Sequence, residues 1–270
     1  LSNTRDGEEV EYCKTHKNMS KLQESAAFMK IYAAAQKKFN LEVEKNANKK
    51  EAGVVYTIPV VFHVLHNGGT ENISREQILD CIDIMNRDFR RLNTDADNVV
   101  STFQGMPTDA EIQFALATKA PNGACFGGIT RTQSSLTTDT ENDNIDGQDQ
   151  LNAALGGNDV YQSTSSTSGW RQDEYLNIIV ADEIGGAAGY TFNPWGSSQI
   201  YPNTIWVLHN YVGSIGTSSI SSSRTLTHEV GHWLNLSHTW GGNNNPGNAS
   251  SCSSDDGVND TPNTIGVTSC

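Results

Sequence analysis

Three of the seven histidines lie close together in the stretch "THEVGHWLNLSHTW", residues 227–240. His228 and His232 are four residues apart, so on an α-helix their side chains lie on one face, one turn apart. Both imidazoles can then reach a single metal ion. Glu229 lies one step round the helix, where its carboxylate can reach a water molecule held by that ion without being a ligand itself.

His238 follows His228 by ten residues, which is too far for an unbroken helix. On such a helix its side chain would lie about 80° from the face of the other two histidines and roughly 15 Å along the axis. The chain must therefore turn back between His232 and His238. Asn235 stands at that turn, where glycine adopts the left-handed conformation most easily and asparagine is the next most frequent choice. We predict a positive φ at Asn235, at a cost of about 1 kcal/mol relative to glycine.

Three neutral imidazoles with a fourth position left open are typical of a catalytic zinc site, whereas a structural zinc site has four protein ligands. Zinc lowers the pKa of a bound water toward ~7, and Glu229 is expected to accept the proton of that water and pass it to the leaving amine. The chain contains no G-x-S-x-G sequence for a serine nucleophile. The stretch therefore predicts zinc-dependent hydrolysis without a covalent intermediate.

The elements that must position these residues follow an α/β pattern. The stretch "VVYTIPVVFHVLH" (54–66) is apolar and rich in β-branched residues, which predicts a central strand. A helix is expected over residues 74–93, because Ser74 and Gln77 have capping-box spacing. Apolar residues also recur there at steps of three and four, namely Ile78, Ile82, Met85, Phe89 and Leu92.

Four further strands are expected, at residues 111–118, 175–182, 187–193 and 204–209. A second helix is expected to begin at about Leu226. The polar tract at residues 132–169 is predicted to be a surface excursion. Strand, helix, strands and helix in this order indicate a three-layer α/β domain. The histidines in or at the end of strands are expected to be hydrogen-bonded within or beside the core; these are His63, His66 and His209.

Charge divides the 270-residue chain, whose net charge is −13, into two parts. Residues 1–50 carry ten Lys or Arg and seven Asp or Glu, and a helix is predicted around residues 21–39. The remaining residues carry eight basic and 24 acidic side chains. We therefore expect a basic N-terminal segment, a linker with the sequence "EKNANKKEAG" (44–53) and an acidic main domain over residues 51–270.

Composition also bears on partners and location. The acidic main domain lacks the clustered Lys and Arg that bind nucleic-acid phosphates. No stretch approaches the roughly 18 consecutive apolar residues of a membrane span. The chain does not begin with Met and its first residues contain no apolar run, so a secretion signal is expected to have been removed and the protein to be extracellular.

Several motifs together resemble one family. "HEVGHWLNLSH" resembles the metzincin zinc signature, and with it "IPVVFHVLH", "GITRTQSS", "GGAAGYTFNP" and "DDGVNDTP" resemble the pappalysin (cytophagalysin) metallopeptidases over about residues 54–265. The resemblance implies a metzincin fold, with a twisted, mainly parallel five-stranded sheet, a backing helix and an active-site helix. Residues 1–50 would then be a mainly helical propeptide, and the protein a latent zymogen that acts on protein or peptide substrates.

The resemblance also implies roles for individual residues. His228, His232 and His238 match the zinc ligands, and Glu229 matches the general base. The edge strand that pairs with extended substrate would contain Ala187, Ala188, Gly189 and Tyr190, although an ordinary edge strand is the alternative. "DDGVNDTP" matches a calcium-binding loop, for which a solvated acidic turn is the alternative. The candidate calcium ligands are Asp255, Asp256, Asp260 and Thr261.

Metzincins carry a methionine-containing turn after the third histidine, whereas the last methionine here is Met106. We expect that turn to lie in a C-terminal part of the domain that this chain does not include. The primary specificity pocket would lie there as well.

The five cysteines leave several pairings open. Cys13 lies in the N-terminal segment, and its thiolate could fill the open zinc position and so make the propeptide an inhibitor. In pappalysin-like proforms glycine usually follows that cysteine, where Lys14 stands here, and a structural Cys13 is the alternative. Cys81 is expected to be a buried thiol or bonded to Cys125, and Cys252 to pair with Cys270 or with a cysteine beyond it.

Two other functions compete with a zinc endopeptidase. A catalytically silent metal-binding or adhesion module would keep the sheet and the calcium loop, but it would not need the carboxylate of Glu229. A zinc hydrolase of another substrate class would not need an edge strand for extended peptides. The sequence therefore favours a secreted zinc endopeptidase in its zymogen form.

Overall fold

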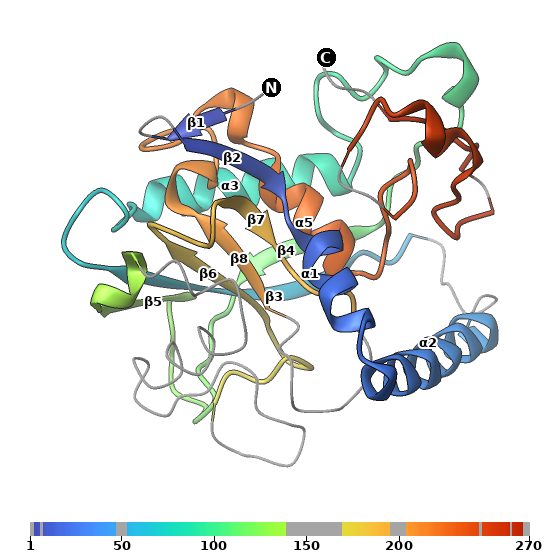
Figure 1. Ribbon diagram of the computed structural model, residues 1–270. Coiled ribbons are helices and arrows are strands. Elements are labelled where there is room, and N and C mark those ends of the chain that lie inside the picture. Colours follow the sequence, from blue (N-terminus) through green and yellow to red (C-terminus); the bar gives the residue numbers. More distant parts are fainter. Residues whose placement is uncertain are drawn as a thin grey trace.

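The apolar stretch after the N-terminal segment forms the central strand of a mixed sheet. The computed structural model describes residues 3–5, 8–46, 53–138, 169–194, 204–242, 245–259 and 261–266. Within these residues the sheet has eight strands in the order β1-β2-β7-β8-β6-β3-β4, and β5 pairs with β3 (Figure 1). The strands are β1 (Asn3–Arg5), β2 (Glu8–Cys13), β3 (Tyr56–His66), β4 (Ile112–Leu116), β5 (Ile129–Gln133), β6 (Leu176–Ala181), β7 (Ala187–Tyr190) and β8 (Ile205–Leu208).

Most strand pairs are parallel, and the apolar residues of β3, β6 and β8 agree with this, because parallel strands are usually buried on both faces. β4 and β5 take successive halves of the same edge of β3, so six strands of the main domain form five rows. The predicted count of five thus omits β5, and it also omits β1 and β2 from the N-terminal segment. β7 is antiparallel to β8, and β2 is parallel to β7.

The described α-helices are α1 (Thr15–Gln23), α2 (Ala26–Asn46), α3 (Arg75–Phe89) and α5 (Thr225–Trp233). α3 confirms the predicted backing helix, and the Ser74 hydroxyl accepts a hydrogen bond from the Gln77 N–H at its start (3.1 Å). It ends earlier than expected, because the chain leaves the helix at Arg90 and Arg91 has a φ of 52°. Leu92 therefore lies outside the apolar stripe and is 68% exposed.

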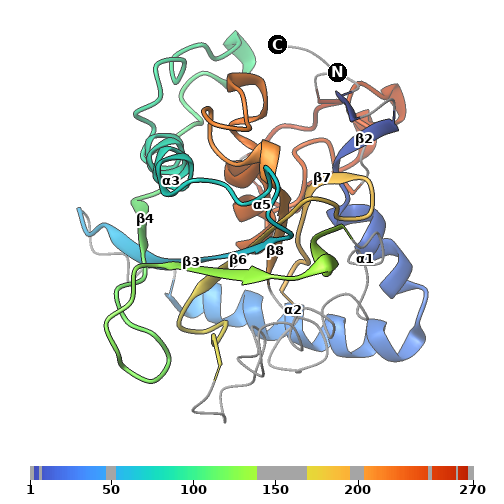
Figure 2. The ribbon, with the colours of Figure 1, turned by 90° about the vertical axis from the view of Figure 1, so that its left-hand side faces the viewer.

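α3 and α5 lie together on one side of the sheet, and α2 lies on the other (Figure 2). The apolar stripe of α3, with Ile78 and Met85, is buried against the strands and against Leu226 and Val230 of α5. This shared core holds α5 over β7 and β8. The predicted α/β architecture is confirmed, and it places the histidine-bearing helix beside an edge of the main-domain sheet.

The N-terminal segment is only partly as predicted. Instead of one helix around residues 21–39, it has two helices that are separated at Glu24 and Ser25, where the Ser25 hydroxyl accepts a hydrogen bond from the Phe28 N–H (3.3 Å). It also contributes β1 and β2, which were not predicted. Of the expected linker, residues 47–52 lie outside the described residues.

Part of the predicted surface excursion belongs to the fold. Residues 132 and 133 end β5, and the 3-10 helix Ser135–Thr138 follows it. Thr137 is fully buried, and its hydroxyl donates to the Leu65 carbonyl (2.9 Å). Residues 139–168 lie outside the described residues. Among the described helices, none is long and apolar enough to cross a membrane.

Candidate metal centre and its surroundings

The end of α5 brings the third histidine back to the first two. Asn235 has a φ of 73°, as predicted. Its N–H donates to the His232 carbonyl (2.8 Å), and the Leu236 N–H donates to the Gly231 carbonyl (2.9 Å), which closes the helix with a left-handed turn. The reversal places His238 against His228 and His232.

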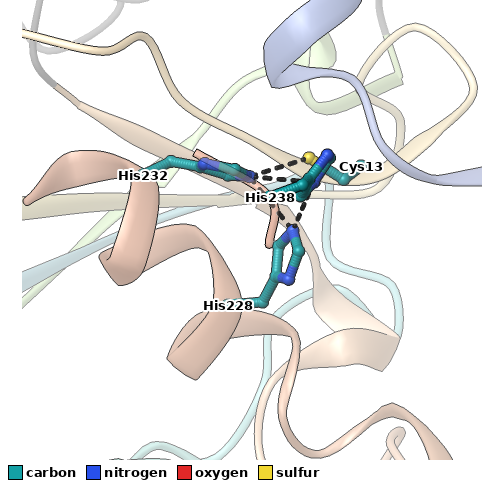
Figure 3. A group of neighbouring side chains, drawn as sticks. All are labelled: Cys13, His228, His232 and His238. Atoms are coloured by element: carbon teal, nitrogen blue, oxygen red, sulfur yellow. Dashed lines mark hydrogen bonds between the residues drawn. The ribbon is translucent and has the colours of Figure 1, made fainter. Parts of the chain in front are cut away.

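The imidazoles of His228, His232 and His238 meet through their Nε2 atoms. These three atoms lie 3.1 to 3.2 Å from one another. The Cys13 Sγ lies 3.5 Å from the His232 Nε2, and all four donor atoms lie within 4.8 Å of one another (Figure 3). Among the described residues this is the only such group of His, Cys, Asp or Glu ligands.

The three Nε2–Nε2 distances and the distance from the Cys13 Sγ to the His232 Nε2 fit the ligand shell of a tetrahedral zinc ion. With Zn–N bonds of about 2.05 Å and a Zn–S bond of about 2.3 Å, nitrogen ligands lie about 3.3 Å apart, and sulfur lies about 3.6 Å from nitrogen. Hydrogen bonds alone do not explain the cluster, because each Nε2 of a neutral imidazole either donates or accepts, so at least two of the three Nε2 atoms have the same role and cannot bond to each other. The donor set and its geometry therefore fit zinc.

The histidines are held in the form that binds a metal. The His232 Nδ1 lies 2.8 Å from the Leu236 carbonyl oxygen, which can only accept, so Nδ1 carries the proton and the Nε2 lone pair faces the cluster. Burial lowers the pKa of His232 to about 4. Burial, with the neighbouring imidazoles, lowers the pKa of His228 well below its usual value. Both rings are neutral at pH 7.

Cys13 reaches the histidines because its strand extends the sheet. β2 pairs with β7 in a register that sets Cys13 beside Gly189, and the Lys14 N–H donates to the Gly189 carbonyl (3.3 Å). Burial, followed by the negative charge of Glu229, raises the pKa of the Cys13 thiol well above its usual value. A bound cation would reverse this effect, because it stabilises the thiolate.

Glu229 is fully buried beside this cluster. Burial raises its pKa to about 8, against the opposing effect of hydrogen bonds from Cys13 and Thr15. The close approach of α5 to β7 depends on Gly189, where a Cβ would lie 3.0 Å from the Glu229 Cγ and 3.1 Å from the Thr225 Cγ2. The predicted base thus lies between the histidines and the edge strand.

The sequence reasoning missed three residues of the N-terminal segment that flank Cys13. The Thr15 hydroxyl donates to the Glu229 Oε2 (3.1 Å). The His16 ring lies against the rings of His238 and His232, with centroids 4.5 and 5.6 Å apart, and the Tyr12 ring meets His228 edge-on at 5.5 Å. The only signal for them in the sequence is their proximity to Cys13.

The predicted substrate strand is covered by the N-terminal segment. β7, which consists of Ala187, Ala188, Gly189 and Tyr190, is buried throughout. The Glu11 N–H donates to the Gly186 carbonyl (2.9 Å), and the Lys14 ammonium donates to the Gly185 carbonyl. β7 is therefore an edge of the main domain that accepts another extended segment.

The predicted calcium ligands lie in a surface loop. The carboxylates of Asp255 and Asp256 accept hydrogen bonds from the N–H groups of Gly257 (2.6 Å) and Val258 (2.9 Å). Thr261 is half-buried, and Asp260 lies outside the described residues. Neither described aspartate forms a three-ligand cluster with other described His, Cys, Asp or Glu side chains. The loop is thus compatible with an acidic turn and with an ion site completed by other oxygens.

The other cysteines and histidines behave in part as expected. No disulfide joins Cys81 to Cys125, since Cys81 is a buried thiol and Cys125 is exposed, so the predicted alternative of a bond between them is wrong. Cys252 is unbonded and exposed, and Cys270 lies outside the described residues. His63 is buried and bonded to Thr130 and Asn177, and His209 contacts Thr217 and Asp182. For His66 the expectation is wrong, since its Nδ1 is buried without a hydrogen-bond partner among the described residues.

Comparison with known proteins agrees with this geometry. The sequence model of the Peptidase_M43 family, described as pregnancy-associated plasma protein-A, matches residues 159–270. A promirolysin mutant from Tannerella forsythia is 30% identical, with a TM-score of 0.69 over 93% of this chain and 76% of that chain. Mature mirolysin in complex with a cleaved peptide is 34% identical, with a TM-score of 0.61 over 78% of this chain and 73% of that chain.

Curated relatives carry related names. An extracellular metalloprotease of Colletotrichum graminicola is 25% identical over 71% of this chain and 54% of its own length. Extracellular metalloprotease 1 of Coccidioides posadasii is 35% identical over 32% of this chain and 30% of its own length. The chain thus spans about half, or less, of the length of these curated relatives. The mirolysin-like fold, the family match and the shared zinc signature together show that the chain belongs to the pappalysin family (Peptidase_M43) of metallopeptidases.

Proposed function

We propose that this chain is part of a secreted zinc endopeptidase, and that residues 1–50 are a propeptide that keeps it latent. The observation that carries the proposal is the cluster of Cys13 with the three histidines beside the buried carboxylate of Glu229. A silent binding module would have no use for a buried acid at this place, because an unneeded buried carboxylate costs stability.

His228, His232 and His238 would hold the zinc ion in the active enzyme, and Cys13 would be the fourth ligand in the latent form. When bound, zinc supplies Lewis acidity for the attack of water on a peptide carbonyl. Family membership supports zinc as the metal. The neutral state of the buried His228 and His232 rings supports their part as ligands.

Glu229 would act as the general base. Once the N-terminal segment leaves, its carboxylate faces the space that Cys13 and Thr15 occupied, where a water molecule can enter. The carboxylate would accept a proton from that water and deliver it to the nitrogen of the leaving amine. The short approach of α5 to β7 at Gly189 would keep the carboxylate beside a peptide bound on the edge strand.

Peptide substrates would bind by adding a strand to β7. The backbone groups that now hold the N-terminal segment, including the carbonyls of Gly186 and Gly189, would then bond to substrate. Mature mirolysin, which is similar to this chain, has been solved with a cleaved peptide. This mode of binding favours an endopeptidase over a zinc hydrolase of small molecules.

The proposal also includes secretion and a calcium ion. Secretion is supported by relatives that are named extracellular metalloproteases. Calcium is proposed as a second ion, with Asp255, Asp256, Asp260 and Thr261 as candidate ligands, because the loop offers several oxygen atoms. The opposite charges of the N-terminal segment and the main domain support the inhibitory pairing.

The test is peptide cleavage by the protein with its complete catalytic domain, after the linker at residues 44–53 has been cut and the N-terminal segment removed. With zinc and calcium present, the cut protein is expected to cleave peptides, a chelator is expected to abolish cleavage, and Glu229→Gln is expected to lower kcat by about 10²–10⁴-fold. Glu76→Gln, on the exposed face at the start of α3, is the matched control. No cleavage by the cut wild-type protein, or full activity of Glu229→Gln, would refute the proposed function.

A further inference from the structure

Thr15 of the N-terminal segment contacts the predicted base directly. Its hydroxyl donates to the Glu229 Oε2 (3.1 Å) and accepts a hydrogen bond from the Thr191 backbone N–H (3.0 Å). Thr15, Glu229 and Thr191 are all fully buried. A single hydroxyl thus joins the carboxylate on α5 to the chain directly after β7.

The direction of these bonds follows from the groups involved. A backbone N–H can only donate, so the Thr15 oxygen must accept from Thr191, and its one hydrogen is left for the Glu229 carboxylate. Thr15 is the first residue of α1, and the hydroxyl is directed away from its own helix toward the main domain. Its bonding capacity is used on two groups of the candidate active site.

Cys13 and Thr15 therefore contact different parts of the site. Cys13 lies against the histidines, whereas Thr15 occupies the oxygen of Glu229 and an N–H group next to the strand on which peptide substrates are proposed to bind. Cys13 also forms a hydrogen bond with the Glu229 carboxyl, so Thr15 adds a second bond to that group and is the residue that bonds the Thr191 N–H. The two contacts are separated by Lys14 only, whose N–H pairs with Gly189.

We infer that Thr15 makes a second inhibitory contact of the latent form, which blocks the base and the Thr191 N–H next to β7 while Cys13 blocks the metal position. The inference rests on the proposed function. Losing this hydrogen bond leaves the buried Glu229 carboxyl and the buried Thr191 N–H each with one partner fewer, which costs free energy whether or not Glu229 is ionised. The segment is then held at this site by a contact that does not depend on the metal.

The rate at which iodoacetamide alkylates Cys13 tests this inference, since it reports release of the segment without any need for activity. It is measured on the zinc-loaded full chain, with Cys125, Cys252 and Cys270 replaced by serine, while Cys81 is a buried thiol. Thr15→Val is expected to raise the rate about tenfold, which corresponds to about 1.4 kcal/mol. Thr15→Ser keeps the hydroxyl and is expected to react at the parent rate. Thr137→Val, at a buried threonine outside the site, is the matched control.

A double-mutant cycle assigns the effect to the Thr15–Glu229 contact. In a Glu229→Ala background only the bond from the Thr191 N–H remains to be lost, so Thr15→Val is expected to raise the alkylation rate less than it does in the parent. An unchanged rate in Thr15→Val alone, or a tenfold rise with and without Glu229, would overturn the inference. If Thr15→Val does not fold, Thr15→Ala takes its place. Peptide cleavage by the Thr15→Val protein, after its N-terminal segment has been cut and removed, tests the proposed function separately. Neither Cys13 nor Thr15 then contacts the site.

Discussion

The side-chain amides of Asn235 and Gln36 exchange two hydrogen bonds. The Asn235 Nδ2 donates to the Gln36 Oε1 (3.0 Å), and the Gln36 Nε2 donates to the Asn235 Oδ1 (3.4 Å) and to the Pro194 carbonyl (2.8 Å). Asn235 stands where the long zinc motif has glycine. It keeps the left-handed turn of that motif and adds a contact with α2 that glycine cannot make.

Replacing Asn235 by glycine is expected to loosen α2 and leave the histidine cluster intact. Glycine takes a positive φ at no steric cost, while the two bonds to Gln36 are lost, which removes about 1 kcal/mol of docking energy. Amide hydrogen exchange in residues 26–46 should become about fivefold faster. Gln36→Ala, which also loses the bond to Pro194, should have at least as large an effect. Unchanged exchange in both variants would contradict this role.

Replacing Cys13 by alanine is expected to release part of the latency without any cut in the chain. The fourth position of the cluster then becomes open to water, while Thr15 still contacts Glu229. Peptide cleavage by the intact Cys13→Ala protein should exceed that of the intact wild type at least tenfold. Cys125→Ala changes an exposed cysteine and should stay latent. Equal latency of wild type and Cys13→Ala would rule out the thiol as an inhibitory ligand.

His63 is expected to make the fold less stable in mild acid. Burial lowers its pKa from 6.5 to about 4, and the Asn177 oxygen accepts from the His63 Nε2, which opposes this shift in part. Between pH 6.5 and about pH 4, the His63 ring therefore binds a proton in the unfolded chain but stays neutral in the folded state. The stability due to the neutral ring is present above pH 6.5 and is lost as the pH falls toward 4, with a loss of about 2 kcal/mol at pH 5.

Urea unfolding at pH 7.5 and pH 5 measures this effect. His63→Gln has no titrating ring, so its unfolding free energy should fall by about 2 kcal/mol less than that of the wild type over this range. The difference between the two proteins removes the contributions of the other histidines. Parallel pH dependence in both would show that His63 does not titrate as its burial implies.

Calcium is expected to stabilise the domain through the loop at residues 255–261. At one hundred times its dissociation constant, a bound ion adds about 2.7 kcal/mol, which corresponds to a rise in Tm of roughly 5–10 °C for a domain of this size. Asp256→Asn should lose most of that rise. Asp83→Asn, on the exposed face of α3, should keep it. An equal rise in both variants, or none in the wild type, would favour a simple acidic turn.

Local patterns predicted the elements whose own residues determine them. The apolar run of β3, the cap at Ser74 and the turn at Asn235 each follow from the residues present at those positions. β2 was missed, because its sequence "EEVEYC" is acidic and becomes a strand only by pairing with β7. β5 was missed for the same kind of reason, since it is short and completes an edge of β3.

For the candidate site, too, the sequence predicted the local features and missed the contacts between distant parts of the chain. The spacing of His228, His232 and His238 on a helix and a turn is a local property, so the sequence predicted their meeting. The contacts of Thr15 and Gln36 join residues that lie far apart along the chain, and neither residue type has an unusual local pattern. Such contacts follow from the docking of the N-terminal segment on the sheet edge, which no short motif encodes.

X-ray absorption at the zinc edge tests the central claim most directly, because it counts the ligands of the metal before and after the N-terminal segment is removed. For the intact chain we predict one zinc per molecule with one sulfur ligand at about 2.3 Å and three nitrogen ligands at about 2.0–2.1 Å. After the segment is cut and removed, the sulfur should be replaced by a light atom while the three nitrogens remain. Less than stoichiometric zinc, or no sulfur ligand in the intact chain, would contradict the account.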